Sequence, residues 1–390
     1  MNLKKDKWLK TEFPDAIDFQ EGPGILAKDF RNDGVPLIRL SGMDDGVSLL
    51  NGCNYLDENL VAKKYEHFRV RKGDIILSTS ATLGKTSFVD EEAVGAIVYT
   101  GLVRMRPKNK SVYAPFIKYL LQGPSFIKQI ESMGVGSVMK HFGPTHLKKI
   151  SVTLPTFHEQ KTISEIFPAL ETAIEQVDGQ EKNLKALQKS LVNGLLNKKP
   201  VFGNLMNSKN CIPTTFGEIS ECDKKYPEHE KQVERFVGLE WIEGDNFQLQ
   251  GFGLVANGTT FTKRFAKGDV LFGKRRAYLK KVAVADFDGI CSGDILVIRA
   301  KAKKMLQGLL PYYISADVFI QHAVSTSAGS LSPRTKWKDL AELEISIPDL
   351  KTQEKILEVL RQLDNTINQI KKQKTTLKNL KRKLLDEILG

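Results

Sequence analysis

The sequence has few cysteines and no long apolar run, and these absences exclude several classes of protein. Its 390 residues include only four cysteines and no CxxC pair, so we expect reduced, packed thiols and no disulfide framework. No apolar run approaches the roughly 20 residues that a membrane-spanning helix needs, and we expect no membrane partner. Residues 1–7 carry three lysines and no apolar stretch, so we expect a cytoplasmic protein without a secretory leader.

The sequence also lacks the common catalytic and cofactor motifs. The LGKT stretch at residues 83–86 ends like a phosphate-binding loop, but Thr79 stands where its first glycine belongs. The six histidines show no metal-ligand spacing. There is no glycine-rich methyl-donor loop, no NPPY-type tetrapeptide and no Asp/Glu-x-Lys at nuclease spacing after Pro14-Asp15 or Pro348-Asp349. These absences favour a recognition protein, without metal or cofactor, whose chemistry is done by another chain.

What the chain does contain is one unit repeated at an offset of 193 residues. The first copy opens LKKISVTLPTFHEQKTI at residue 147 and the second LAELEISIPDLKTQEKI at residue 340. Each opening precedes a long segment whose apolar residues recur at steps of four and three, the pattern of a coiled-coil seam. The seam residues are Ile163, Phe167, Leu170, Ile174, Val177, Leu184, Leu191 and Leu195 in the first copy, and Ile356, Leu360, Leu363, Ile367, Ile370, Leu377, Leu384 and Ile388 in the second.

A tandem repeat of this kind predicts two α/β domains related by a pseudo-two-fold axis. Helices that pair across such an axis run antiparallel, so we expect the two seams to form an antiparallel coiled coil. With Ile163 set against Ile388, Glu181 lies within a turn of Lys374, and we expect an ion pair there. The alternative is that each helix covers only its own domain. The predicted segments are a first domain at 1–155, a helix at 156–197, a linker at 198–212, a second domain at 213–348 and a helix at 349–390.

Local patterns predict the elements inside each domain. Pro168 predicts either that the first long helix begins at Ser164 or that it bends at the proline. In both domains a Lys-Gly-Asp turn, at residues 72–74 and 267–269, precedes a buried strand. We expect strands at 35–40, 75–77, 96–99, 102–105, 236–239, 270–272 and 295–298, and helices at 113–130 and 309–324.

The formal net charge of +12 favours a polyanionic partner. Arginine can donate two bonds to guanine, whereas lysine mostly meets phosphate. The alternative for each cation is an ordinary solvated surface. The candidate nucleic-acid contacts are Lys274, Arg275, Arg276, Tyr278, Arg334 and Lys336 in the second domain, and Lys85, Arg104, Arg106, Lys140 and His141 in the first.

Taken together, these residues resemble the specificity (S) subunits of type I restriction-modification enzymes. The motifs that carry the resemblance are EGPG at 21–24, IRL at 38–40, GDIILS at 73–78, and the paired joints at 150–160 and 345–353. The second joint departs from the first, because its acidic residue follows the glutamine instead of preceding it. The joint followed by a coiled helix, present twice, is the strongest mark.

The resemblance implies two target-recognition domains, each reading one half of a split double-stranded DNA sequence. It implies that the two helices form an antiparallel spacer and dock two methyltransferase (M) subunits, which restriction (R) subunits can join. It further implies that the chain is not catalytic, and that S-adenosylmethionine, ATP and Mg are bound by the partner subunits.

Two other functions stay open on the residues alone. A single-chain restriction enzyme or methyltransferase would need a catalytic motif unlike those considered above. A structural adaptor would bind proteins through its two domains, although the basic charge and the clusters of arginine with aromatic residues argue against it.

Overall fold

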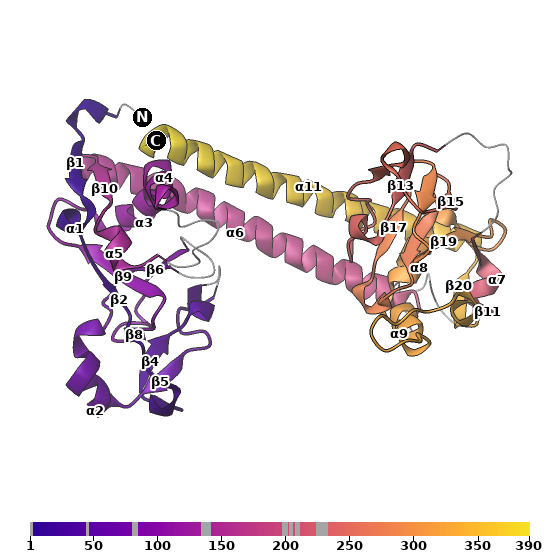
Figure 1. Ribbon diagram of the computed structural model, residues 1–390, viewed down its shortest axis with the longest axis horizontal. Coiled ribbons are helices and arrows are strands. Elements are labelled where there is room, and N and C mark those ends of the chain that lie inside the picture. Colours follow the sequence, from indigo (N-terminus) through magenta and orange to yellow (C-terminus); the bar gives the residue numbers. More distant parts are fainter. Residues whose placement is uncertain are drawn as a thin grey trace. The chain divides into compact units, whose positions relative to one another are not determined.

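The computed structural model describes residues 3–43, 47–79, 85–133, 142–196, 202, 206, 211–223 and 233–390. Its internal contacts divide the chain into two compact units, visible in Figure 1. Unit 1 comprises Met1–Gly179 and Lys372–Gly390, and unit 2 comprises Gln180–Lys371. Each unit therefore holds one globular domain and part of both long helices. None of the described helices is both long and apolar enough to cross a bilayer.

Unit 1 contains two four-stranded sheets and a two-stranded ribbon. The sheets have the orders β2-β9-β6-β7 and β3-β5-β4-β8, and the ribbon pairs β1 with β10, the strand before the first long helix. Four of these strands confirm the predicted ones: β4, β6, β8 and β9. The strands are β1 (Leu9–Glu12), β2 (Ile17–Glu21), β3 (Phe30–Arg31), β4 (Val35–Ile38), β5 (Asn54–Leu56), β6 (Ile75–Ser78), β7 (Thr86–Phe88), β8 (Ile97–Val98), β9 (Leu102–Pro107) and β10 (Ser151–Leu154).

Unit 2 repeats this plan. Its sheets have the orders β12-β19-β16-β17 and β14-β13-β18-β15, and its ribbon pairs β11 with β20, the strand before the second long helix. The predicted strands are confirmed as β13, β16 and β19. The strands are β11 (Cys211–Thr215), β12 (Ser220–Cys222), β13 (Arg235–Val237), β14 (Gly253–Leu254), β15 (Lys263–Phe265), β16 (Val270–Gly273), β17 (Val282–Val284), β18 (Gly289–Cys291), β19 (Ile295–Ala300) and β20 (Glu344–Pro348).

Each predicted domain helix is in fact two helices. Gly123 has extended backbone (ψ 144°) because the following Pro124 disfavours the helical conformation, and Ala316 is extended at the same place in unit 2 (ψ 141°). The short helices of unit 1 are α1 (Phe13–Ala16), α2 (Glu58–Leu60), α3 (Ala114–Gln122), α4 (Pro124–Ser132) and α5 (Pro144–Leu147). Those of unit 2 are α7 (Phe216–Ile219), α8 (Leu310–Ser315), α9 (Asp317–Ser325) and α10 (Trp337–Ala341).

The two long helices are α6 (Phe157–Gly194) and α11 (Leu350–Leu389). Thr156 and Glu159 cap α6 reciprocally, since each backbone N–H donates to the other side chain, at 3.1 and 3.4 Å. Asp349 caps α11 by accepting from Thr352 N–H at 3.0 Å. Because α6 runs from Phe157 through Pro168 without interruption, the predicted start at Ser164 is wrong.

A buried glutamine explains the joint that is repeated in the sequence. Gln160 Nε2 donates to the carbonyls of Pro155 and Ser111, both at 2.9 Å, and its Oε1 accepts from Tyr113 N–H at 2.8 Å. The side chain is fully buried. It thereby fastens the start of α6 both to the strand before it and to the segment that leads into α3.

Gln353 makes the same three bonds in unit 2. Its Nε2 donates to the carbonyls of Pro348 and Lys304, at 2.9 and 2.8 Å, and its Oε1 accepts from Leu306 N–H at 3.0 Å. It is also fully buried. The glutamine is therefore a structural fastener for each strand-to-helix joint, and its side-chain hydrogen bonds require an amide.

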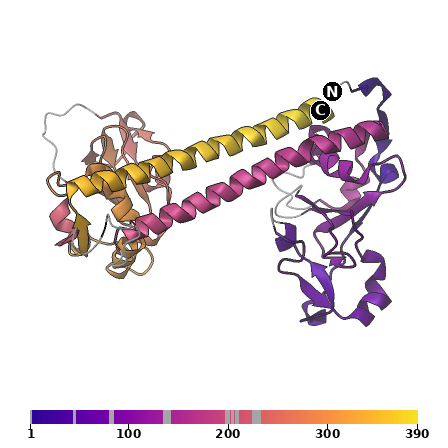
Figure 2. The ribbon, with the colours of Figure 1, turned by 180° about the vertical axis from the view of Figure 1, so that it is seen from behind.

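The long helices run antiparallel within each unit, where Figure 2 shows them side by side. In unit 1, Lys381 Nζ donates to Glu171 Oε1 at 2.6 Å, and Lys374 donates to Asp178. In unit 2, Gln188 donates to Asp364. The residue numbers of each pair add to 552, one more than in the predicted alignment of Ile163 with Ile388.

The predicted ion pair of Lys374 with Glu181 would join the two units and stays a prediction. Within unit 1, Lys374 forms an ion pair with Asp178, one turn before Glu181, and within unit 2 Glu181 forms an ion pair with Lys185 at 2.6 Å. The one-residue difference arises because two apolar residues, Ile388 and Leu389, stand together at the end of the second seam, and both are buried.

The ends of the two helices complete the cores of the units. The core of unit 1 includes Ile163 and Phe167 from the start of α6, and also Ile388 and Leu389 from the end of α11. Lys5 Nζ donates to the carbonyl of Glu387 at 3.0 Å, which satisfies one of the last carbonyls of α11. The middle seam positions Ile174, Leu184, Ile370 and Leu377 are only partly buried.

Unit 2 has the same arrangement with the helices exchanged. Its core includes Leu195 from the end of α6 and Ile356 and Leu360 from the start of α11. Asn193 and Asp317 hold the end of α6 against α9, through bonds of 2.7 Å from Asn193 Nδ2 and 2.8 Å from Asp317 N–H. Each core thus requires both repeats.

One carboxylate occupies the same repeat position in both units, but its surroundings differ. Glu171 accepts from Lys118 at 2.7 Å and from Lys381 at 2.6 Å, and burial is outweighed by these lysines, so the pKa of Glu171 lies below its ordinary value. Asp364 accepts from Tyr312 and Gln188, and burial raises its pKa. The first carboxylate is stabilised as an anion, whereas burial disfavours the charged form of the second.

Replacing Gln353 by leucine should destabilise unit 2 by about 2–4 kcal/mol, because three backbone groups around this buried position, one of them in a buried bond and two in partly buried bonds, would lose their partner. Urea unfolding monitored by circular dichroism measures the change. Gln362→Leu, at an exposed position of the same helix, is the matched control and should change the free energy of unfolding by less than about 0.5 kcal/mol. Equal effects of the two substitutions would contradict the role assigned to Gln353.

Glu171→Gln and Asp364→Asn should respond to pH in opposite directions. A lowered pKa gives Glu171 a stabilising contribution that is present near neutrality and lost as pH falls through its folded pKa, so Glu171→Gln becomes more destabilising as pH rises. A raised pKa makes the Asp364 contribution fall as pH rises, so Asp364→Asn becomes less destabilising. Thermal unfolding of both variants from roughly pH 3 to pH 7 tests this, because the Glu171 contribution changes below its ordinary pKa, and parallel trends would be inconsistent with it.

Candidate nucleic-acid interface

The structure brings the two basic clusters of the second domain onto one surface. The connection between β16 and β17 carries residues 274–281, and it meets the segment 331–336 that leads into α10. Arg276 N–H donates to the carbonyl of Pro333 at 2.8 Å, and Thr335 N–H donates to the carbonyl of Lys274 at 3.1 Å. Arg275 and Arg334 also face each other across an isolated β-bridge. We call this pair of connections the basic loop of unit 2.

The backbone of the basic loop is fixed in an uncommon conformation. Arg276 and Lys280 have left-handed φ angles of 54° and 51° on either side of a short turn. Each costs on the order of 1 kcal/mol or more for a residue with a side chain, so the surrounding bonds must hold the loop in place. Ala277 is buried beneath the turn, whereas Tyr278 and Leu279 are 53% and 43% exposed. The turn thus presents an aromatic and an aliphatic side chain to solvent.

A carboxylate pairs with part of this positive charge. Arg334 Nε and Nη2 donate to the two oxygens of Asp294, at 2.7 and 3.1 Å, and this bidentate bond lowers the pKa of that carboxyl. Arg275 donates to Ser332 Oγ at 3.1 Å and lies 3.8 Å from the same aspartate. These two guanidinium groups are therefore oriented by the protein itself.

The remaining candidate cations of unit 2 differ in their exposure to solvent. Arg276 is exposed and its Nη2 lies 3.5 Å from the Leu331 carbonyl. No salt bridge is found for Arg276, Lys274 or Lys336 within the described ranges. Arg276 and Lys336 are exposed and Lys274 is partly exposed, so they are the cations of the basic loop best placed to meet a phosphate or a base.

The corresponding connection of unit 1 is held by the same backbone bonds. Ser78 N–H donates to the carbonyl of Lys85 and Phe142 N–H donates to that of Thr79, at 2.9 and 3.2 Å. The equivalent backbone bonds in unit 2 run from Gly273 N–H to the carbonyl of Lys281 and from Thr335 N–H to the carbonyl of Lys274. Lys85 is partly buried immediately before β7. The predicted contacts Lys140 and His141 lie outside the described residues.

The expectation for Arg104 is corrected by its burial, and Arg106 is also engaged within the fold. Arg104 is 5% exposed and donates to Asp18 and Gln20, at 2.9 and 3.1 Å. Arg106 donates two bonds to Asp74, at 2.9 and 2.6 Å. Both lie on β9, where their guanidinium groups hold the sheet and its neighbouring turn together. Arg104 therefore has little surface to offer a nucleic acid.

The Arg106–Asp74 pair recurs in unit 2, which explains why the Lys-Gly-Asp turn is repeated. Arg299 donates two bonds to Asp269, at 2.5 and 2.6 Å, and that aspartate also accepts from Ala266 N–H at 2.7 Å. The preceding glycine has a positive φ in both turns, 80° at Gly73 and 92° at Gly268. This motif is structural in both units.

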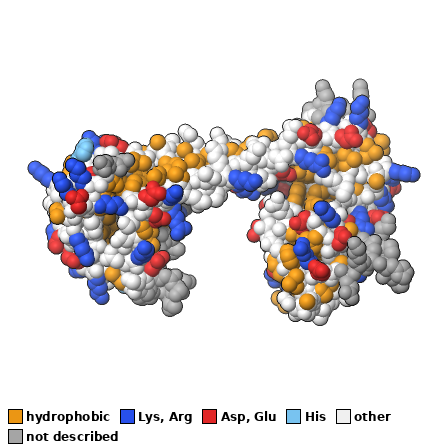
Figure 3. Space-filling model, turned by 90° about the horizontal axis from the view of Figure 1, so that it is seen from above, with side chains coloured by type: hydrophobic (Ala, Val, Ile, Leu, Met, Phe, Trp, Pro, Cys, Tyr) orange, Lys and Arg blue, Asp and Glu red, His pale blue; other side chains and the backbone are white. Residues whose placement is uncertain are grey.

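Arginine–aromatic stacks on the second sheet of each unit were not among the sequence candidates. Arg39 lies 4.5 Å from the ring centre of Tyr99, and Arg235 lies 4.4 Å from that of Phe252, which is 42% exposed. The partners are 60 and 17 residues apart in the sequence, so spacing gave no signal of either stack. The face of the molecule shown in Figure 3 carries both charge signs interspersed, which agrees with local basic loops instead of one uniformly positive face.

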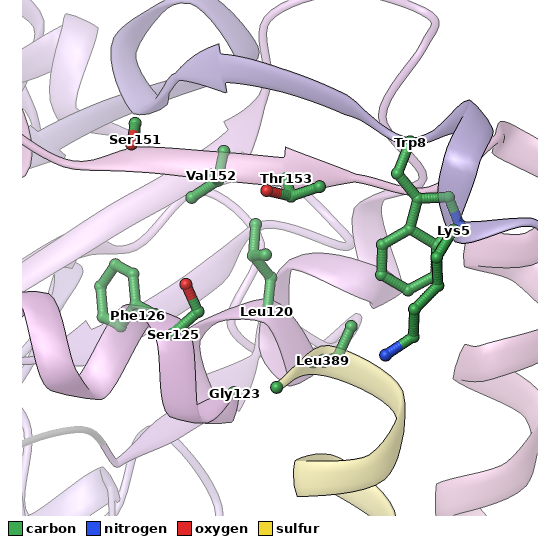
Figure 4. Close-up of a pocket in the computed structure, with 11 residues that line it drawn as sticks. Lys5, Trp8, Leu120, Gly123, Ser125, Phe126, Ser151, Val152, Thr153 and Leu389 are labelled. Atoms are coloured by element: carbon green, nitrogen blue, oxygen red, sulfur yellow. The ribbon is translucent and has the colours of Figure 1, made fainter.

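Within the described residues, no group of three or more His, Cys, Asp and Glu could hold a metal ion. Burial raises the pKa of Cys291 to about 12 and also raises that of Cys222, so these thiols stay protonated near neutrality. A cavity of about 200 Å³ lies in unit 1 between Trp8, Leu120 and Leu389 (Figure 4). Its lining is mostly apolar side chains and hydroxyls, with Lys5 at one side.

The sequence matches a known protein family over most of its length. The family model for the type I restriction modification DNA specificity domain matches residues 5–186 and 223–379. The chain belongs to this family. The resemblance found in the sequence is thereby confirmed, and the two matched stretches each cover one of the repeats.

Individual members of the specificity family differ in how much of the chain they match. The type I restriction enzyme EcoDI specificity subunit of Escherichia coli is 26% identical over 301 residues, 66% of this chain and 64% of that protein. The chain thus aligns with less than two thirds of that relative. The putative MjaX specificity subunit of Methanocaldococcus jannaschii is 22% identical over 412 residues, 98% of this chain and 93% of that protein.

A solved structure supports the same fold for the whole chain. The crystal structure of the type I restriction-modification system S subunit from M. genitalium matches with a TM-score of 0.59 and 15% identity, covering 100% of this chain and 97% of that one. The expected architecture of two α/β domains with two long helices forming an antiparallel coiled coil is therefore confirmed.

Proposed function

We propose that this chain is the DNA-recognition subunit of a type I restriction-modification complex. The observation that carries the proposal is the repetition of one connection, with the same backbone bonds, in both units of a chain from the specificity family. In unit 2 this connection is the basic loop. Two such readers in one chain suit a DNA target in two parts, each part read by one unit.

The basic loop can contribute to recognition in two ways. Lys274 and Lys336 suit phosphates, because an ammonium group acts as a point charge, whereas Arg276 can donate two parallel bonds to one base or phosphate. Tyr278 and Leu279 add exposed apolar surface beside these cations. Because Asp294 and the left-handed turns hold the loop in shape, binding would order few side chains, which reduces its entropic cost.

In this proposal the chain itself is not catalytic. Two methyltransferase (M) subunits, and restriction (R) subunits where present, would bind S-adenosylmethionine, ATP and Mg and act on the DNA that this chain selects, in the cytoplasm. The named relatives are specificity subunits of type I restriction enzymes, which supports this division of labour. The described residues provide no observation that favours a single-chain restriction enzyme or a protein-binding adaptor.

Arg276→Ala should weaken binding of the assembled complex to its DNA target about tenfold at fixed salt, since loss of one base or phosphate contact by arginine costs about 1–3 kcal/mol. If Arg276 meets a phosphate, the slope of log K against log salt should become shallower by about 1. Arg276→Lys would retain that slope and lose only bidentate recognition. Fluorescence anisotropy with labelled DNA across a salt series provides these values.

Lys355→Ala is the matched control, because it removes one exposed positive charge from α11 within the same unit. It should leave affinity and salt dependence nearly unchanged. If Arg276→Ala binds as tightly as the parent complex at every salt concentration, the assignment of the basic loop as a DNA reader is wrong.

A further inference from the structure

The polar residues in the middle of the helix pair form a charge pattern that depends on which two helices meet. In unit 1, α6 contributes Glu171 and Asp178, and α11 contributes their partners Lys381 and Lys374. In unit 2, Gln188 bonds Asp364, and one heptad further along the same register Glu181 stands opposite Lys371. Acid on α6 thus faces base on α11 at three successive polar positions.

The repeat makes it possible to compare this pairing with its closest competitors. Because α11 is a copy of α6 displaced by 193 residues, two α6 helices from separate molecules could align in the same antiparallel register. That alignment would set Asp178 of one molecule against Glu181 of the other, twice by symmetry. Two α11 helices would likewise set Lys371 against Lys374, twice.

At the two central positions, both same-helix pairings therefore place like charges where α6 with α11 places opposite ones, while two α11 helices would also set Lys381 against Asp364 at the outer positions. The apolar seam does not make this distinction, since apolar side chains occupy equivalent seam positions in both helices. In two-stranded coiled coils, flanking charges commonly determine which helices pair, whereas the apolar seam supplies the stability. Asp178 and Lys374 retain 32% and 23% of their side-chain exposure, so their attraction is screened, and discrimination must come from several such positions together.

We infer that the charges at 178, 181, 371 and 374 select the partner helix, so that α6 associates with α11 and not with a second copy of itself. This selection concerns pairing between helices and is independent of the proposed DNA function. It gives a duplicated chain a means of folding on itself, although its two similar helices could otherwise join different molecules into mixed assemblies.

Two full-length variants test this inference. Asp178→Lys with Glu181→Lys makes the middle of both helices positive, and Lys371→Glu with Lys374→Glu makes both negative. Each variant alone should lose the helix pairing and unfold at a lower temperature than the parent. When the two are co-expressed, the positive α6 of one can pair with the negative α11 of the other in both directions. We expect a 1:1 complex of about twice the 43.7 kDa chain mass by light scattering.

Further variants make the result decisive even if a single variant does not fold alone. A chain that carries all four substitutions restores opposite charges and should be monomeric, with an unfolding temperature close to that of the parent. Glu165→Lys with Glu175→Lys, and Lys355→Glu with Lys372→Glu, change the net charge equally at exposed positions and should neither destabilise the monomer nor form a complex on mixing.

Three results would overturn the inference. The first is that the Asp178→Lys/Glu181→Lys variant and the Lys371→Glu/Lys374→Glu variant both keep the parent's unfolding temperature and stay monomeric. The second is that co-expression yields no 1:1 complex, which would mean that the charges do not choose the partner. The third is that the chain with all four substitutions unfolds at as low a temperature as either double variant.

Discussion

The rest of the structure depends on the way that two helices complete each other's domains. Neither globular domain closes its core with its own repeat alone. Unit 1 needs Ile388 and Leu389 from the end of α11, and unit 2 needs Leu195 from the end of α6. Because each apolar helix end is buried in a core, separating the helices would expose apolar surface in both units. The antiparallel direction follows from this exchange.

Around that shared framework, the two repeats have diverged in chemistry while keeping their geometry. Gln160 and Gln353 make the same three bonds, and the Lys-Gly-Asp turns bind equivalent arginines. The carboxylates at 171 and 364 keep their place but differ in charge environment, with two lysines beside the first and Tyr312 and Gln188 beside the second. The scaffold positions are therefore maintained, whereas the surfaces that they present are free to differ.

The sequence predicted the parts of the fold that repetition makes visible. The offset of 193 residues identified the long helices and their joints, and local patterns identified seven of the twenty described strands. The break between α8 and α9 gave no local signal, because Ala316, whose backbone is extended there, is a good helix former. The proline after Gly123 did carry a signal, through its effect on the preceding residue. The register was one residue off because adjacent apolar residues at the helix end suit both alignments.

For the candidate interface, composition located the basic loop but did not separate exposed cations from structural ones. Arg104 and Arg276 look alike in sequence, yet the first is buried against Asp18 and Gln20, and the second stands on an exposed turn. The acids that bind a structural arginine come from distant segments, as Asp294 does for Arg334, so spacing along the chain carries no trace of the pairing.

The most direct measurement of the central claim is intramolecular cross-linking of the two helices, in a chain whose four native cysteines are replaced. Cysteines at 171 and 381, which face each other in the antiparallel register, should form a disulfide under mild oxidation, detected by mass spectrometry of the digested monomer. Cysteines at 171 and 364, which would face each other only if the helices ran in the same direction, should stay reduced. Cross-linking of the second pair in place of the first would contradict the account.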